Sequence, residues 1–131
     1  MTVIALVMDK VEQQNYKDLR VWQHSRELVK LIYLLTQSFP DEEKFGLTNQ
    51  MRRAAVSVPS NISEGSGRQH PKDTIQFLVL ARGSLYELET QCYLAFDLSF
   101  INQEQLQYIE EKIVHCIQLV QGFIRYYRSL G

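Results

Sequence analysis

The sequence predicts an all-α fold, an antiparallel up-down-up-down four-helix bundle that forms an oligomer. Three observations predict it. Apolar residues recur at spacings of three and four over four long segments, few prolines and glycines interrupt these segments, and no strand pattern has a partner strand. Because 131 residues fit one domain, we expect residues 16–131 to form the bundle and residues 1–15 to form a variable N-terminal arm.

The first two helices are predicted from their caps and apolar stripes. The first runs from about residue 18 to residue 38, with Asp18 capping its start, and its apolar residues cover more than half of the helix circumference. The second runs from about residue 45 to residue 64. Pro59 lies inside this second stripe and removes a backbone donor, so we expect it to bend the helix or restart it near Ser57.

The last two helices carry the most regular apolar patterns. The third runs from Pro71 to about Asp97, and proline suits a first helical turn. The fourth runs from about Asn102, which can cap it, to Leu130. These regular spacings are typical of antiparallel helices packed like a coiled coil. The predicted core positions are Leu78, Ala81, Leu85, Leu88, Cys92 and Ala95 in the third helix, and Leu106, Ile109, Ile113, Cys116, Val120, Phe123, Tyr127 and Leu130 in the fourth.

Apolar residues outside these stripes predict self-association. A monomeric bundle needs one buried apolar stripe per helix. A water-soluble chain does not usually expose many further apolar residues outside these stripes. We therefore expect a homo-oligomer, and the alternative is that residues 2–8 fold back over the surplus. The surplus residues are Phe77, Val79, Leu80, Tyr86 and Tyr93 in the third helix, and Ile117, Ile124 and Tyr126 in the fourth.

Composition excludes several classes of protein. Hydrophobic residues make up 45% and charged residues 22%, which excludes a disordered chain, and a net charge of −1 argues against a strongly basic nucleic-acid binder. The longest apolar run, residues 3–8, is too short to cross a membrane. Cys92 and Cys116 lie far apart in sequence, so we expect buried free thiols and a cytoplasmic protein with no membrane partner.

The motifs of common enzyme classes are missing from the sequence. A di-iron bundle needs Glu-x-x-His motifs, and the nearest pattern is Glu111 with His115, one helical turn later. There is no nucleophile elbow and no P-loop. The glycines of residues 65–68 follow a helix, so they fit a helix C-cap better than a phosphate-binding loop. We expect a non-enzyme with no metal ion, cofactor or small-molecule substrate.

Charge is unevenly distributed along the chain. Residues 44–82 carry six basic residues against two acidic ones, a local balance of +4. Basic side chains with polar neighbours suit phosphate contacts, so Arg52, Arg53, Arg68 and Lys72 are the candidate nucleic-acid-binding residues. The alternative is a solvated face with internal pairing, in which Glu64 pairs with Arg68 or with an arginine of a neighbouring helix.

Three segments resemble a known family. Residues 16–22 read YKDLRVW, residues 47–68 read LTNQMRRAAVSVPSNISEGSGR, and residues 83–89 read GSLYELE. The second segment is the longest and most specific. Together they resemble the bacterial four-helix-bundle family of 23S ribosomal RNA intervening-sequence proteins, over about residues 16–130.

The resemblance implies a ring-shaped homopentamer without a defined catalytic activity. Related accessory proteins of diversity-generating retroelements bind RNA and a reverse transcriptase, but they are strongly basic, whereas this chain is slightly acidic. The implied role is binding of RNA or of an RNA–protein complex. The alternative role is a scaffold ring that binds a partner protein and makes no contact with nucleic acid.

Several polar motif residues have a structural interpretation. Asn61 and Glu64 lie three positions apart, which places them on one face of the second helix. Glu64 near Arg52, Arg53 or Arg68 would form a buried or interfacial pair that fixes the register between helices or subunits. Ser84, with its neighbour Gly83, would permit close helix approach. We therefore assign Asn61, Glu64 and Ser84 to structure or assembly.

Overall fold

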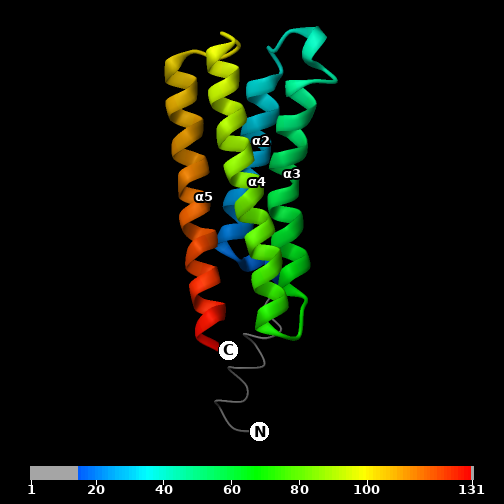
Figure 1. The fold of residues 1–131 in the computed structure, drawn as a ribbon, viewed down its shortest axis with the longest axis vertical. Helices are drawn as coiled ribbons and strands as arrows, with labels where there is room; N and C mark the ends of the chain where they lie inside the picture. The colour runs from blue at the N-terminus through cyan, green and yellow to red at the C-terminus, as the bar shows by residue number, and fades with distance from the viewer. Residues whose placement is uncertain (1–14, 131) are drawn as a thin grey trace, which may run out of the picture.

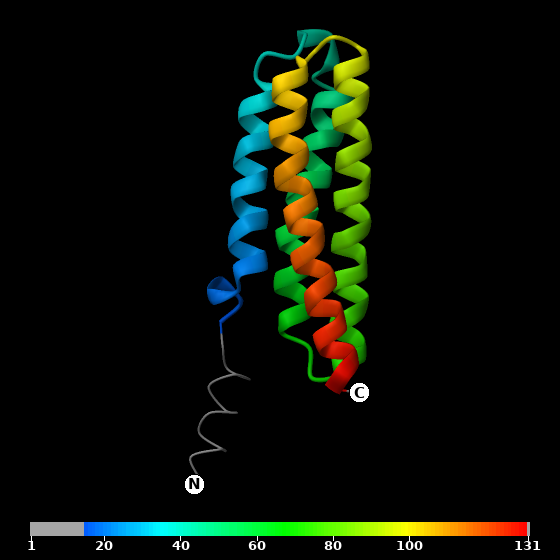
Figure 2. The ribbon, with the colours of Figure 1, turned by 90° about the vertical axis from the view of Figure 1, so that its left-hand side faces the viewer.

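The computed structural model describes residues 15–130. In this part of the chain there are four α-helices, two short 3-10 helices and no strand, so the all-helical prediction is confirmed. The four α-helices lie side by side along one long axis (Figures 1 and 2). The elements are η1 (Tyr16–Asp18), α2 (Arg20–Thr36), η2 (Asp41–Glu43), α3 (Leu47–Ser66), α4 (Pro71–Asp97) and α5 (Gln103–Leu130).

The connections divide between the two ends of the bundle. Figure 1 shows the α2–α3 and α4–α5 connections at the top and the α3–α4 connection at the bottom, near the C-terminus. The α2–α3 connection contains η2, whereas residues 67–70 alone join α3 to α4. The two connections that flank α3 therefore lie a full helix length apart. The alternative to self-association, that residues 2–8 fold back over the surplus apolar surface, concerns residues outside the described part of the chain.

The prediction that Asp18 caps the first helix is wrong. Asp18 ends η1, whose own cap is Asn15, with its side-chain oxygen accepting a hydrogen bond from the Lys17 amide at 3.1 Å. Helix α2 begins at Arg20, and Leu19 precedes it without a side-chain cap. Residues 16–18 form a short turn of 3-10 helix, which satisfies their backbone groups locally. The α-helix therefore begins two residues later than predicted.

Helix α3 is continuous through Pro59, so the restart expected near Ser57 does not occur. Pro59 and the preceding Val58 are both buried. Proline in a helix removes one backbone donor, and burial against neighbouring helices holds the helix together there. At its start, the Glu43 Oε2 atom accepts a hydrogen bond from the Leu47 amide at 2.9 Å.

The predicted caps of α4 and α5 are confirmed. Pro71 is the first residue of α4, where its missing N–H would have had no partner. At the start of α5, the Asn102 side chain accepts a hydrogen bond from the Gln105 amide at 2.8 Å, and the Gln105 side chain accepts one from the Asn102 amide at 2.9 Å. This reciprocal pair is the capping-box arrangement with glutamine at its third position.

The core follows the predicted stripes closely in α4. All six predicted core positions of that helix are buried, and α2 and α3 add further buried apolar residues. Burial of one Leu or Ile side chain stabilises the fold by about 1.5–3 kcal/mol, so this shared core dominates the energetics. The buried apolar residues of the first two long helices are Val21, Leu28, Ile32, Met51, Ala54, Ala55, Val58 and Ile62.

The predicted core of α5 is wrong at its C-terminal end. Ile117 and Ile124, expected outside the core, are buried, whereas Leu130 is 53% exposed. Phe123 and Tyr127 are only partly buried. A straight helix rotates by about 20° per heptad relative to a strict seven-residue repeat, so the buried face drifts over a long helix.

Four of the five surplus apolar residues of α4 remain exposed in the single chain, whereas Phe77, also expected outside the core, is partly buried against Gly65. We use the term α4 outer face for Val79, Leu80, Gly83, Tyr86 and Tyr93. The four apolar side chains of this face are 37–57% exposed. A Cβ atom added at Gly83 would meet nothing within 4 Å among the described residues, so the close helix approach expected there is not made inside the single chain and stays a prediction for the assembly.

Candidate nucleic-acid interface

Arg52 is held in place by helix α2. Its Nε donates a hydrogen bond to Thr36 Oγ1 at 2.9 Å, and its guanidinium lies 4.6 Å from the ring centroid of Tyr33. Thr36 is itself buried and donates to the Ile32 carbonyl at 2.8 Å. Arg52 therefore has one fixed orientation, with its planar group stacked on an aromatic face.

Beside Arg52 is a cavity of ≈ 660 Å³, here called the α2–α3 cavity. Its lining contains three cationic side chains, two aromatic rings and no carboxylate. Phe45 projects at its edge with 87% of its surface exposed, and the Lys44 Nζ lies 5.7 Å from the centre of that ring. The lining residues are Tyr33, Lys44, Phe45, Thr48, Asn49, Arg52, Arg53, Val56 and Ser57.

Arg68 and Lys72 lie at the other end of α3. The Arg68 guanidinium lies 4.7 Å from the ring centroid of Phe77, and Lys72 is exposed in the first turn of α4. The helices approach closely here, because a Cβ atom at Gly65 would lie 2.8 Å from the Cβ of Phe77. Thr74 Oγ1 also donates a buried hydrogen bond to the Gly65 carbonyl at 2.8 Å.

The four candidate binding residues therefore form two clusters and no single patch. Arg52 and Arg53 lie near the α2–α3 connection, whereas Arg68 and Lys72 lie at the α3–α4 connection. At a rise of 1.5 Å per residue, the Arg53 and Arg68 backbones are about 20 Å apart along α3. At the α3–α4 connection Glu64 and Asp73 offset Arg68 and Lys72, so the local balance of +4 comes from Lys44, Arg52, Arg53 and Arg82.

The glycines of residues 65–68 end helix α3, as the C-cap interpretation expected. Gly67 is the C-cap residue with φ of −86°, and no glycine of the described residues has a positive φ. The helix therefore ends without a left-handed residue. Gly65 has a different role, because it lies inside the helix and gives the close approach to Phe77.

The polar motif residues have distinct local contacts. Ser57 Oγ donates to Ser84 Oγ at 2.6 Å, a direct contact between α3 and α4, and Asn61 Nδ2 donates to the Ser57 carbonyl at 2.8 Å. Glu64 is exposed, so within the single chain it does not form the buried pair considered from the sequence. The interfacial version of that pair belongs to the assembly.

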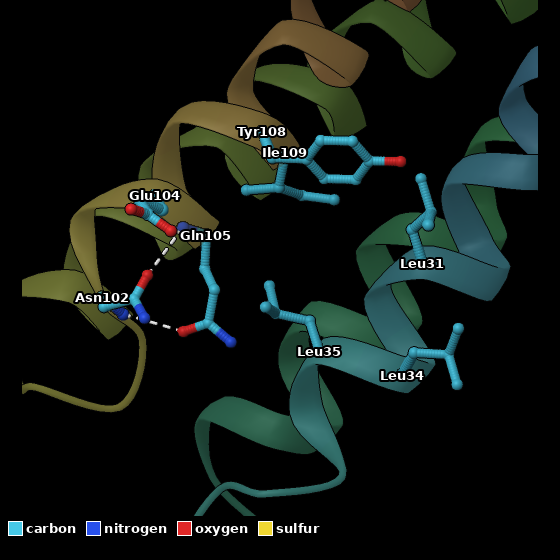
Figure 3. Close-up of a pocket in the computed structure, with 8 residues that line it drawn as sticks. All are labelled: Leu31, Leu34, Leu35, Asn102, Glu104, Gln105, Tyr108 and Ile109. Atoms are coloured by element: carbon cyan, nitrogen blue, oxygen red, sulfur yellow. Dashed lines mark hydrogen bonds between the residues drawn. The ribbon is translucent and has the colours of Figure 1, made fainter.

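A second concavity of ≈ 390 Å³, the α2–α5 groove, is mainly apolar. Figure 3 shows the Tyr108 side chain reaching across it toward α2, with the hydrogen-bonded Asn102 and Gln105 at one end. Leu34 and Tyr108 are each 52% exposed. The lining residues are Leu31, Leu34, Leu35, Asn102, Glu104, Gln105, Tyr108 and Ile109.

The remaining titratable groups show no built catalytic arrangement among residues 15–130. His115 lies against His24, with ring centroids 4.7 Å apart, and desolvation followed by the charges of His115, Arg20 and Lys112 lowers the pKa of His24. Both cysteines are free and buried, as expected. Burial raises the pKa of Cys92 to about 12 and that of Cys116 to about 11. No group of three potential His, Cys, Asp or Glu metal ligands occurs in this part of the chain.

The model of one protein family matches residues 17–122, and its description is 23S rRNA-intervening sequence protein. The chain belongs to this family. Among solved structures, it is similar to a protein of unknown function from the S23 ribosomal protein family of Bacteroides thetaiotaomicron. That similarity has a TM-score of 0.72 and 24% identity, and it covers 79% of this chain and 97% of the other. No curated protein matches the chain.

Membership of the 23S rRNA-intervening sequence protein family confirms the resemblance carried by the three sequence segments. The matching crystal structure supports the four-helix fold and assigns no function. Within residues 15–130, no helix combines the length and apolar character that a membrane crossing requires.

The sequence did not indicate the full lining of the α2–α3 cavity. Tyr33 and Thr36 lie in the first helix, and their contacts with Arg52 span 16 or more positions of sequence. Phe45 had a detectable signal, because an aromatic residue beside a lysine in a loop is not needed for a helical core. The predicted second helix begins at about residue 45, so the sequence pattern places Phe45 in a helix and hides its exposure.

Proposed function

We propose that this chain is a non-enzymatic subunit of a cytoplasmic homo-oligomer that binds RNA or an RNA–protein complex. The observation that carries the proposal is the α2–α3 cavity, lined by three cations and no carboxylate. A concave site with one sign of charge attracts a polyanion even when the whole chain is near neutral. The family description names an intervening sequence of 23S rRNA and no bound partner, so the proposal rests on the charge of the cavity.

The α4 outer face supports the oligomer. It exposes two tyrosines and two aliphatic side chains around Gly83, and a glycine in the middle of a helix costs about 1 kcal/mol relative to alanine. Among residues 15–130, no atom lies within 4 Å of a Cβ built at Gly83, which is explained if a second copy packs there. We propose up-down-up-down subunits in a ring, with five copies as the family resemblance implies.

Light scattering tests the oligomer with a Gly83→Leu variant. Open space around Gly83 leaves the isolated subunit folded, whereas a leucine at a subunit contact separates the copies. We expect the mass to fall to the 15.3 kDa of one chain. The matched control is Gly122→Leu, at a partly buried glycine of α5 with only the Arg125 guanidinium nearby. An unchanged mass for Gly83→Leu removes this face from the assembly.

RNA binding is tested by gel mobility shift with a structured RNA at two salt concentrations. The double variant Arg53→Glu with Arg68→Glu should bind more weakly, and the salt dependence should become shallower by about 0.7–0.9 in slope per lost phosphate contact. The single variants show which end contributes. Arg128→Glu, at an exposed arginine in the last turn of α5, is the matched control. Unchanged binding by the double variant contradicts the basic sites.

The alternative function, a scaffold for a partner protein, is supported by the α2–α5 groove. Its exposed Tyr108 is of a residue type enriched at protein contacts, and the exposed Leu34 adds apolar area to the groove. If the protein is a scaffold, Arg53→Ala should dissociate the assembly, which light scattering would show as a lower mass. The same variant should leave RNA binding unchanged. Failure of the intact oligomer to bind RNA at low salt would also favour the scaffold function.

A further inference from the structure

Phe45 is the least expected side chain on the surface of this protein. It is 87% exposed, so it contributes little to the core, and it lies at the edge of the α2–α3 cavity. The other exposed large apolar residues of the described chain have exposures of 36–57%. An almost free aromatic face next to a concavity provides a surface on which a flat ligand can stack.

The α2–α3 cavity combines the Phe45 ring with three cationic side chains, Lys44, Arg52 and Arg53. Lys44 lies over the Phe45 ring, and Arg53 is exposed on the first turns of α3. Arg52, in the same lining, lies over the Tyr33 ring and is fixed by its hydrogen bond to Thr36. The hydrogen-bonding side chains of Thr48, Asn49 and Ser57 complete the polar part of the lining.

This set of groups matches the parts of a nucleotide. A nucleobase needs a flat apolar partner, whereas its phosphates need cations whose positions cost little entropy to fix. The cavity volume of ≈ 660 Å³ falls within the range of about 300–1,000 Å³ that is typical of ligand pockets. A carboxylate-bearing ligand would use the cations and leave the Phe45 ring without a role.

We propose that the α2–α3 cavity binds an unpaired nucleotide of RNA, with its base stacked on Phe45 and its phosphates held by Lys44 and Arg53. The inference rests on the proposed RNA-binding function and adds a preference for single-stranded segments. Bases inside an A-form duplex are stacked on one another, and side chains do not reach them through its deep, narrow major groove. Only a loop, bulge or end presents a base that an exposed ring can accept.

The experiment compares two RNA probes by fluorescence anisotropy, a short oligouridine and a blunt duplex of the same length. Phe45→Ala should weaken oligouridine binding by about 5- to 100-fold, the range of one lost base–aromatic stack, and leave the salt slope unchanged. Phe45→Trp should restore the affinity. Because Phe45 is exposed, neither variant should change the melting temperature.

Tyr108→Ala is the matched control. Tyr108 is also an exposed aromatic residue with a lysine over its ring, since the Lys112 Nζ lies 5.4 Å from the ring centroid, but the α2–α5 groove has no cation in its lining. We expect Tyr108→Ala to bind oligouridine like the unmodified protein. Equal losses for Phe45→Ala and Tyr108→Ala overturn the assignment to the cavity.

The remaining outcomes separate this inference from the function on which it rests. If the unmodified protein binds both probes with a salt dependence and Phe45→Ala changes neither, RNA binding stands and the nucleotide pocket is wrong. If the unmodified protein binds neither probe at low salt, both proposals fail. If Phe45→Ala lowers the mass in light scattering, the cavity is a subunit contact and the inference is overturned.

Discussion

The two ends of α3 carry the same kinds of residue and use them differently. At the α2–α3 end, Arg52 is stacked on Tyr33 beside an open cavity. At the α3–α4 end, Arg68 is stacked on Phe77, which is packed against Gly65. One arginine–aromatic pair lines a concave surface and the other covers a tight helix contact. Charge counted along a chain therefore does not show which basic side chains line an open surface and which also lie over a helix contact.

The largest expected effect is a loss of folding stability caused by a substitution at the α3–α4 end. Gly65→Val places a side chain 2.8 Å from the Phe77 Cβ and 3.3 Å from the Thr74 carbonyl oxygen, so the helices must separate. We expect a loss of about 1–3 kcal/mol in the free energy of unfolding, measured by urea denaturation. Gly67→Ala is the control, because its Cβ would meet only the Glu64 carbonyl oxygen at 3.8 Å. Equal stability of the two variants contradicts the close contact.

A smaller effect is expected at the α2–α3 end. Arg52→Met keeps the aliphatic stem but loses the hydrogen bond to Thr36 and the contact with Tyr33. The Thr36 hydroxyl retains its bond to the Ile32 carbonyl, so no donor is left unpaired. We expect a loss of about 1 kcal/mol in urea denaturation. A loss as large as that of Gly65→Val would show that this end is as tightly packed as the other.

The smallest effect concerns pH and leaves both ends of α3 intact. The pKa of His24 is lowered in the folded chain from its ordinary value of 6.5, so protonation favours the unfolded state. Stability should therefore fall as the pH drops through 6.5 toward the lowered pKa of the folded chain, by well under about 1 kcal/mol because solvent screens exposed groups. His24→Gln should flatten this part of the stability profile. If stability depended more steeply on pH in His24→Gln than in the unmodified protein, the downward direction assigned to the His24 pKa would be wrong.

Helix periodicity predicted the fold because burial repeats within each helix. The stripe of α4 is correct at every position from Leu78 to Ala95, and the boundaries of that helix match those expected. The α5 prediction fails toward the C-terminal end, where the strict heptad drifts from a helix of 3.6 residues per turn: Ile117 and Ile124 are buried and Leu130 is exposed. The cap at Asp18 fails because a local 3-10 turn competes with the α-helix, and a residue type alone does not decide that competition.

The candidate site was predicted less well because it depends on contacts between helices. The pairing of Arg52 with Thr36 and Tyr33 and the approach of Gly65 to Phe77 have no local sequence signal. Grouping Arg52, Arg53, Arg68 and Lys72 treated proximity along the chain as proximity in space. A helix of known length already places Arg53 and Arg68 about 20 Å apart, so the separation could have been derived.

The short connection between α3 and α4 also has a consequence for biosynthesis. Residues 67–70 join two helices that are in close contact at Gly65, so this hairpin closes a small loop at low entropic cost. The chain leaves the ribosome from its N-terminus, and α5 emerges last. Until then, the apolar stripe that α5 covers faces water. A nascent chain stalled before Gln103 therefore exposes this stripe and becomes a target for chaperones or aggregation.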